Sequence, residues 1–359
     1  MSLAARIHAE IAAAGGWLPF DRFMAMALYE PGLGYYAGGR RKFGQMPSQG
    51  SDFVTAPEMS PLFGRALARQ LAQALAHSGC RDVMEFGAGS GALAAQLIAE
   101  LDALGVGLAR YRIVELSAEL RARQRERLAH WADRVEWLDA LPDAIEAVVV
   151  GNEVLDAMPV QLIVFDGRAW RERGVVSAGE GFAFADRDSA LRPPLDTGFV
   201  PGTVTEIHAQ AEAFMHTLAQ RLKKGAAFFI DYGFPEAEYY HPQRHGGTLM
   251  CHQGHLADAD PLQAVGDKDI TAHVNFTGIA LAGQEAGLTV LGYTSQANFL
   301  LNCGIADLLT SASLGERAMA HRLLAEHEMG ELFKVIGFAP QDAPLDAIGF
   351  ARGDRSHKL

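Results

Sequence analysis

The segment Glu85–Gly91, which reads EFGAGSG, has the residue types and spacing of a ligand-binding turn. It follows a short apolar run and precedes an alanine- and leucine-rich stretch, 92–101, so we expect a strand, a glycine turn and the start of a helix. Glycine leaves no Cβ between backbone N–H groups and a ligand. Glu115 ends the next apolar run, 111–114, where an acid can accept two hydrogen bonds from ribose hydroxyls. Together these features predict a nucleoside-type cofactor in an α/β fold.

The glycine pattern alone fits two cofactors. Gly87, Gly89 and Ala92 match the G-x-G-x-x-A pattern that binds the pyrophosphate of NAD(P). Glu85, however, stands directly before the glycines and would repel a pyrophosphate, whereas it suits the ammonium and sulfonium groups of S-adenosylmethionine (SAM). The motif therefore favours SAM and leaves an NAD(P)-dependent oxidoreductase as the alternative. A tight strand–helix turn without a ligand is the remaining interpretation.

Polar residues also follow two further strands of the expected sheet. Asn152, Glu153 and Asp156 come after the entirely apolar run 147–150. Ligands of open parallel sheets bind outside the carboxyl ends of the strands, so we expect these three side chains to meet the reactive end of the cofactor. Helix capping by Asn152 or Asp156 is the alternative. Asp139 follows the third strand, where it would lie beside adenine or simply close a turn.

Composition limits the class of protein. The 359 residues suffice for one enlarged domain or two, and 49% hydrophobic with 21% charged residues is ordinary for a globular enzyme. The net charge of −12 argues against a broad nucleic-acid-binding surface. The three cysteines are far apart, which predicts no disulfide framework and a reduced compartment. No apolar run is long enough to span a membrane, and the N-terminus lacks the pattern of a signal peptide.

Several histidines lie between residues 241 and 273, among them the H-x-x-H pair His252 and His255. Asp258 and Asp260 are close in sequence, but no nearby cysteine–acid set completes a tetrahedral metal site. We therefore expect no metal and assign these histidines to hydrogen bonds within loops.

Alternation of strands and helices begins at residue 80 and predicts a parallel sheet. Residues 206–224 have apolar side chains at helical spacing, and Gly225 follows Lys223 and Lys224, which predicts a helix that ends at 224. The polar end of the chain, 353–359, is expected to fray. The expected strands are 82–86, 111–114, 135–138, 147–150, 227–231, 288–293 and 332–338, with a hairpin near Asp166–Gly167.

Nine segments of the chain, in order, resemble the MidA-like family of SAM-dependent methyltransferases. This family includes the mitochondrial protein-arginine methyltransferase that assists assembly of respiratory complex I. The matching segments are FDRFMAMALYEPGLGYY (20–36), SDFVTAPEMSPLFG (51–64), EFGAGSGALA (85–94), YRIVELS (111–117), GNEVLDAMPV (151–160), FFIDYG (228–233), GTLMCHQGH (247–255), DITAHVNFT (269–277) and MGELFKV (329–335).

The resemblance implies a class I, Rossmann-like, seven-stranded α/β core with an N-terminal helical addition. The expected division is a helical region with a cofactor-covering loop at 1–78, a core at 79–338 with insertions at about 160–204 and 233–275, and a tail at 339–359. The second insertion would be a lid or substrate loop. In the 51–64 segment, the loop that would lie near the cofactor contains Asp52, Phe53, Thr55, Ala56 and Pro57.

The resemblance also suggests a protein substrate, with arginine side chains as acceptors and a respiratory-complex subunit as one partner, in a bacterial cytoplasmic protein. A SAM-binding scaffold without turnover and a small-molecule methyltransferase are the other interpretations. The basic loop near 40, Asn275 and the pair Cys251–His252 depart from the family pattern on the acceptor side. The candidate catalytic residues are Glu153, Asp156 and Asn152. The candidate cofactor-binding residues are Glu85, Gly87, Ala88, Gly89, Gly91, Glu115, Leu116, Asp139, Asn152, Asp52, Thr55 and Pro57.

Overall fold

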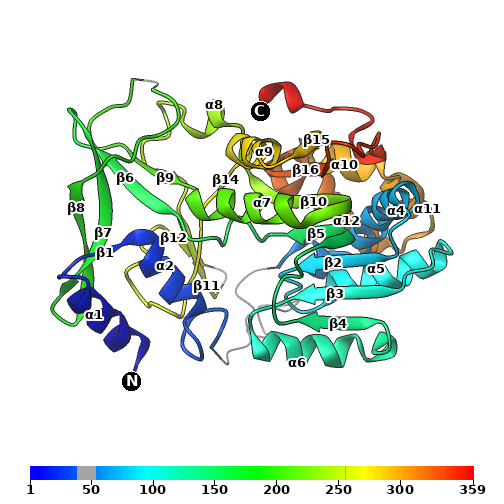
Figure 1. The fold of residues 1–359 in the computed structure, drawn as a ribbon, viewed down its shortest axis with the longest axis horizontal. Coiled ribbons are helices and arrows are strands. Elements are labelled where there is room, and N and C mark those ends of the chain that lie inside the picture. The colour runs from blue at the N-terminus through cyan, green and yellow to red at the C-terminus, as the bar shows by residue number, and fades with distance from the viewer. Residues whose placement is uncertain (39–53, 197, 255) are drawn as a thin grey trace.

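The computed structural model describes residues 1–38, 54–196, 198–254 and 256–359. Within them, seven strands form a continuous sheet in the order β15-β16-β10-β5-β2-β3-β4, and the short β14 pairs with the end of β10 as an eighth strand (Figure 1). Strands β2, β3, β4, β5 and β10 are parallel, whereas β16 is antiparallel to both of its neighbours. The bounds are β2 Asp82–Phe86, β3 Arg110–Val114, β4 Val135–Leu138, β5 Ile145–Asn152, β10 Leu222–Phe234, β14 Val274–Asn275, β15 Leu288–Ser295 and β16 Phe333–Pro340.

Helices cover both faces of this sheet, because alternate residues of its central strands point to opposite sides. Val148 and Val150 of β5 pack in one apolar cluster, whereas Ala147 and Val149 pack in another. The first cluster takes in α4 Pro61–Ser78, α5 Ala92–Ala103, α10 Gln296–Asn302, α11 Ile305–Ser311 and α12 Leu314–Leu324. The second takes in α7 Ala209–Arg221 and α9 Phe276–Glu285, and α6 Ala118–Arg127 connects β3 to β4.

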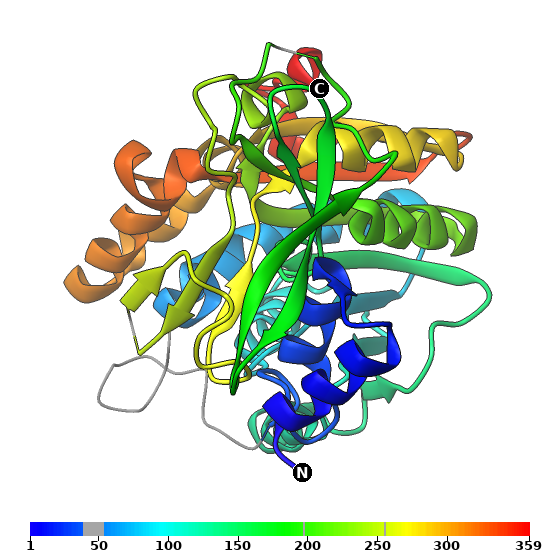
Figure 2. The same ribbon diagram turned by 90° about the vertical axis from the view of Figure 1, so that its left-hand side faces the viewer.

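Two smaller sheets lie beside the carboxyl ends of the central strands, next to the N-terminal helices (Figures 1 and 2). One contains β1 Leu18–Pro19, β6 Gln161–Phe165, β7 Trp170–Ala178, β8 Gly181–Asp188 and β9 Val204–Ile207. The other contains β11 Met250–Gln253, β12 Leu256–Asp258 and β13 Asp269–Thr271. The helices α1 Leu3–Ala13 and α2 Phe20–Tyr29 share a third apolar cluster with both sheets.

The N-terminal 78 residues therefore divide between two packing environments. Helices α1 and α2 pack with the small sheets, whereas α4 packs against α5 on the large sheet. Short helical turns complete the described chain, and none of its helices is long and apolar enough to cross a membrane. These turns are α3 Ala56–Met59, α8 Glu236–Tyr239, Ala129–Trp131, Glu326–Gly330, Ile348–Phe350 and Ser356–Lys358.

The helix expected at 206–224 is shorter than predicted at both ends. Glu206 belongs to strand β9, and the helix α7 ends at Arg221, so Lys223 and Lys224 lie in β10. Gly225 has a φ of 115° inside this strand, where a Cβ would collide with the carbonyl of Ala147 on β5. This glycine therefore permits the close pairing of β10 with β5 and does not cap the helix.

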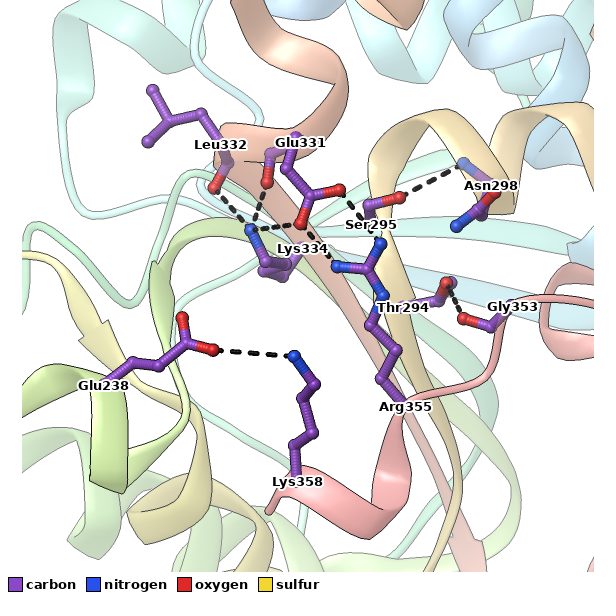
Figure 3. A network of polar contacts seen from close by, with 10 residues as sticks. All are labelled: Glu238, Thr294, Ser295, Asn298, Glu331, Leu332, Lys334, Gly353, Arg355 and Lys358. Atoms are coloured by element: carbon purple, nitrogen blue, oxygen red, sulfur yellow. Dashed lines mark hydrogen bonds and ion pairs between the residues drawn. The ribbon is translucent and has the colours of Figure 1, made fainter. Parts of the chain in front are cut away.

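The end of the chain is ordered, contrary to the expected fraying (Figure 3). Asp354 accepts a hydrogen bond from the backbone N–H of Tyr293 on β15 at 2.9 Å. The Arg355 guanidinium makes a two-point ion pair with the Glu331 carboxylate, which also lies 3.7 Å from the Lys334 Nζ (Figure 3). The polar sequence of this segment does not predict these contacts, because Tyr293 and Glu331 are distant from it along the chain.

We expect Arg355→Ala to lower the free energy of unfolding by about 1 kcal/mol, because it removes a bidentate but partly exposed ion pair. Denaturant unfolding measures the change, provided that the free energy of unfolding depends on denaturant concentration with the same slope in both proteins. Lys358→Ala is the matched control: its ion pair with Glu238 spans 3.6 Å between exposed side chains, so its effect should be near zero. Equal effects of the two substitutions would contradict the assigned anchoring.

Candidate active site

A cavity of about 1240 Å³ opens at the carboxyl ends of β2, β3, β4 and β5. It gathers most of the residues singled out from the sequence, although they come from four separate strand ends and from the segment before α4. The predicted residues that line it are Glu85, Gly87, Ala88, Gly89, Glu115, Leu116, Asp139, Asn152, Glu153, Asp156, Thr55 and Pro57. Gly91 and Ala56 are adjacent but do not line it, whereas Asp52 and Phe53 fall outside the described residues.

The glycine turn after β2 requires glycine at three positions. Gly87, Gly89 and Gly91 have φ values of 63°, 53° and 81°, which other residues adopt only with strain. A Cβ at Gly87 would also come within 3.2 Å of the Val154 side chain. Glu85 lies buried beneath the turn, where the Tyr111 hydroxyl donates a 2.6 Å hydrogen bond to it. Burial raises the pKa of Glu85 to about 8, although the bond from Tyr111 opposes this shift.

Glu115 is held in place at the end of β3. Its carboxylate accepts hydrogen bonds from the backbone N–H of Ser117 at 2.9 Å and from the Gln124 amide at 3.1 Å. The same Gln124 nitrogen donates to the carbonyl of Gly89 at 2.9 Å and so links the Glu115 turn to the glycine turn. Burial raises the pKa of Glu115. Gln124 was not singled out from the sequence, and a lone glutamine within a charged helix gives no signal of this role.

The remaining predicted cofactor-side residues differ in exposure. Leu116 follows Glu115 and leaves 82% of its surface exposed at the cavity wall. Asp139 is exposed at the end of β4 and forms an ion pair with Arg121. Both side chains flank the Glu115 turn, which places an apolar surface and an acid at this end of the cavity.

A network of hydrogen bonds ties the segment before α4 to the glycine turn. Glu58 accepts hydrogen bonds from Ser90 of that turn and, at 2.9 Å, from the Arg127 guanidinium. The Gln96 amide on α5 donates to the carbonyl of Pro57 at 2.7 Å. Thr55 and Pro57 are therefore positioned beside the glycine turn by contacts that sequence reasoning did not identify.

The turn after β5 presents the acidic residues. Glu153 has a φ of 54°, which is uncommon for a residue other than glycine, and its backbone N–H donates to the carbonyl of Ile230 at 2.8 Å. The Asn152 amide donates to the Glu153 carboxylate at 2.9 Å. Within the described residues, the buried Oδ1 atoms of Asn152 and Asp156 have no hydrogen-bond partner. Such atoms are costly unless a ligand supplies the missing donor.

Burial makes these carboxyl groups reluctant to ionise. It raises the pKa of Glu153 to about 8, an effect that the charge of Asp156 reinforces. It raises the pKa of Asp156 to about 6, although a hydrogen bond with Tyr232 opposes the shift. The described lining of the cavity contains seven acidic residues and neither lysine nor arginine: Glu58, Glu85, Glu115, Asp139, Glu153, Asp156 and Asp269. Such a cavity favours cationic ligands.

Aromatic residues complete the side of the cavity next to this turn. Tyr29 and Tyr36 stack with ring centroids 5.5 Å apart, and their hydroxyls donate to the carbonyl of Ala157 and to Asp269, each at 2.8 Å. Tyr232 and His273 also line it, in edge-to-face contact at 5.1 Å. Burial lowers the pKa of His273 to about 4 and so keeps this imidazole neutral near pH 7. None of these four aromatic residues was predicted as a site residue.

Some residues differ from the family pattern in the sequence, and not all of them face the acceptor side of the cavity. His252 lines the cavity, but Cys251 is buried in the apolar cluster of α1 and α2. Asn275 caps α9 by accepting the N–H of Gly278 at 3.3 Å. Among the described residues, no group of three or more His, Cys, Asp or Glu side chains could hold a metal ion.

Comparison with known proteins identifies the cofactor. The family model described as "putative S-adenosyl-L-methionine-dependent methyltransferase" matches residues 66–294. A crystal structure from Burkholderia thailandensis, bound to S-adenosyl-homocysteine, is 55% identical, with a TM-score of 0.96 over 99% of this chain and 96% of that one. A second structure from this organism is 53% identical, with a TM-score of 0.91 over the same shares.

More distant relatives are curated as mitochondrial protein arginine methyltransferase NDUFAF7. The protein from Danio rerio is 27% identical and aligns with 89% of this chain and 83% of its own length. The protein from Homo sapiens is 25% identical and aligns with 96% of this chain and 84% of its own length. The family model, the bound relative and the acid-lined cavity agree: the chain belongs to the family of S-adenosyl-L-methionine-dependent methyltransferases, and its cofactor is SAM.

Proposed function

We propose that this enzyme methylates a protein substrate, at the guanidinium nitrogens of arginine. The observation that carries the proposal is the buried acidic turn: Glu153 and Asp156 face one cavity whose described lining contains neither lysine nor arginine. Arginine stays protonated at physiological pH, and its planar group with five N–H donors matches carboxylates. An arginine side chain would therefore supply the charge and the donors that these carboxyl groups lack.

The residues around the glycine turn and Glu115 fit SAM, on the side of the cavity away from the acidic turn. The positive-φ glycines at 87 and 89 would allow close approach of its methionine part. The cationic groups of SAM would favour the ionised form of Glu85 beneath them, whose pKa burial raises to about 8. Glu115 would accept hydrogen bonds from the ribose hydroxyls. Leu116, Asp139 and the segment with Thr55 and Pro57 would enclose the remainder. When bound, SAM supplies a methyl group on a positively charged sulfur, so the enzyme need mainly orient the acceptor.

Acceptor binding is assigned to the acidic turn and the aromatic wall. Glu153 and Asp156 would grip the guanidinium, with Asn152 orienting Glu153 through their 2.9 Å hydrogen bond. Tyr29, Tyr36 and Tyr232 would present aromatic surface to it, and contact with aromatic rings stabilises guanidinium groups. The new C–N bond releases one proton from the acceptor nitrogen. The Glu153 carboxylate can take up this proton, since its pKa of about 8 is close to physiological pH.

The relatives support the same acceptor. Those curated as NDUFAF7 are named protein arginine methyltransferases, at 25–27% identity for the two proteins described above. A subunit of a respiratory complex is the protein substrate that the family resemblance suggests. The three cysteines are free and buried, which fits the proposed cytoplasmic location. The NAD(P)-dependent alternative loses its support, because the acidic cavity disfavours a pyrophosphate and a relative 55% identical binds S-adenosyl-homocysteine.

Gly89→Val should abolish SAM binding in a calorimetric titration, because a β-branched residue cannot adopt a φ of 53° without strain and would fill the cofactor turn. The matched control is Gly179→Val in the β7–β8 turn, where φ is 61° and a Cβ would have no other atom within 4 Å. The control should bind SAM normally. Retention of binding by Gly89→Val would show that the cofactor lies elsewhere.

Glu153→Gln should retain SAM affinity while methyl transfer falls by about 100-fold or more, because the amide neither balances the guanidinium charge nor accepts its proton. Transfer is followed from tritiated SAM into proteins of an extract of the source organism, with amino-acid analysis for methylarginine. Glu172→Gln, on β7 and outside the cavity lining, is the control and should remain active. Undiminished transfer by Glu153→Gln would refute the role of Glu153, and methylation of another residue type would refute the arginine assignment.

The pH dependence of kcat/KM follows from the raised pKa values. A carboxyl group with a raised pKa stays protonated until the pH exceeds that value, and only the ionised form attracts a guanidinium. We therefore expect kcat/KM for the protein acceptor to rise with pH, first near 6 as Asp156 ionises and then near 8 as Glu153 ionises. A profile that is flat or falls over this interval would contradict the proposed binding of a cation by ionised carboxylates.

A further inference from the structure

Asp231 is a buried carboxyl group that the proposed mechanism does not use. It lies near the carboxyl end of β10, with 1% of its surface exposed, and is absent from the described lining of the cavity. Its neighbour Tyr232 does line the cavity. The sequence shows an acid at this strand end, but gives no indication of what it contacts.

The carboxylate of Asp231 faces the backbone of the acidic turn. Its Oδ2 atom accepts hydrogen bonds from three consecutive N–H groups, those of Val154 at 3.1 Å, Leu155 at 2.9 Å and Asp156 at 3.2 Å. Its Oδ1 atom accepts the N–H of Tyr232 at 2.9 Å. Burial and the neighbouring acids Asp156 and Glu153 raise the pKa of Asp231. The geometry of four backbone N–H groups that donate to one carboxyl group nevertheless fixes the local conformation.

These bonds act on a turn that would otherwise be strained. Glu153 has a φ of 54°, a conformation that costs on the order of 1 kcal/mol for a residue other than glycine. The N–H of Glu153 donates to the carbonyl of Ile230, the residue before Asp231, at 2.8 Å. Four consecutive backbone donors, at residues 153–156, are therefore accepted by two consecutive residues of β10. Ile230 and Asp231 of β10 therefore fix the backbone conformation of the turn.

We propose that Asp231 is a positioning residue for methyl transfer, which holds the backbone of the 153–156 turn so that the Glu153 and Asp156 side chains face the acceptor. This inference rests on the proposed function, in which those two carboxylates grip the guanidinium. Asp231 acts through the turn and touches neither substrate. A displacement of about 1 Å in such a turn can lower a rate by about 100-fold without a change of fold.

The test compares Asp231→Asn with Asp166→Asn in the full chain. Asp166 is the matched control, because its carboxylate also accepts consecutive backbone N–H groups, those of Arg168 and Ala169 at 2.8 Å. It lies in the β6–β7 hairpin turn, which is not part of the described lining of the cavity. Three quantities are measured for each variant: the dissociation constant for SAM by calorimetry, kcat for methyl transfer from tritiated SAM, and amide hydrogen exchange in peptides that cover residues 153–156.

We expect Asp231→Asn to lower kcat by about 10- to 100-fold, to change SAM affinity by less than about threefold, and to accelerate exchange at residues 154–156. Asp166→Asn should alter none of the three. A purely structural role would lower the melting temperature and leave kcat per folded molecule unchanged, which would overturn the proposal. Unchanged exchange at 154–156 would overturn it as well, since the turn would then not depend on Asp231.

The exchange measurement separates this inference from the proposed function. If the wild-type protein binds SAM but methylates no arginine, the proposed acceptor is wrong, and the exchange of residues 154–156 still reports whether Asp231 holds the turn. If wild-type methylates arginine while Asp231→Asn retains full kcat, the acceptor stands and the positioning role fails.

Discussion

Seven acidic residues line one cavity whose described lining contains neither lysine nor arginine, and the cost of that arrangement shapes the site. A buried carboxylate without a counter-charge either stays protonated or must collect hydrogen-bond donors. Glu153 stays protonated below its raised pKa of about 8, and a cationic ligand beside it favours its ionised form. Glu115 gains donors from Ser117 and Gln124. Asp156 Oδ1 has no hydrogen-bond partner in the part of the chain that the structure describes, so it remains for a ligand. Cationic ligands are those that lower the free energy of such a cavity.

The scaffold supports this cavity through contacts between parts of the chain that are far apart in sequence. Strand β10 holds the turn after β5, and the carbonyl of Asp156 accepts the N–H of Ala272 from the insertion at 3.0 Å. Tyr29 of the N-terminal helix α2 donates to Ala157 just beyond the same turn. The large sheet, the insertion and the N-terminal helices thus meet at the acidic turn. This arrangement explains why the small sheets lie beside the carboxyl ends of the central strands (Figure 1).

Local patterns in the sequence predicted the parts of the structure that depend on neighbouring residues. The strand–glycine–helix unit at 82–103 and the polar residues after β5 are found where expected, because apolar runs and glycines determine them locally. The helix expected at 206–224 was wrong at both ends, since apolar spacing does not reveal that Glu206 and Leu222 pair in sheets. Asp231, Gln124 and the tyrosines were missed because their roles arise from contacts across the fold. The division into the domains proposed from the sequence stays a prediction.

In the proposed function, the methyl group of SAM faces the acidic turn. A crystal structure of this protein with S-adenosylhomocysteine tests it most directly, because the sulfur marks where the methyl group leaves. We expect the ribose hydroxyls to contact Glu115 and the sulfur to face the side of the cavity formed by Asn152, Glu153 and Asp156. A sulfur directed away from this turn, or a ribose bound elsewhere, would contradict it.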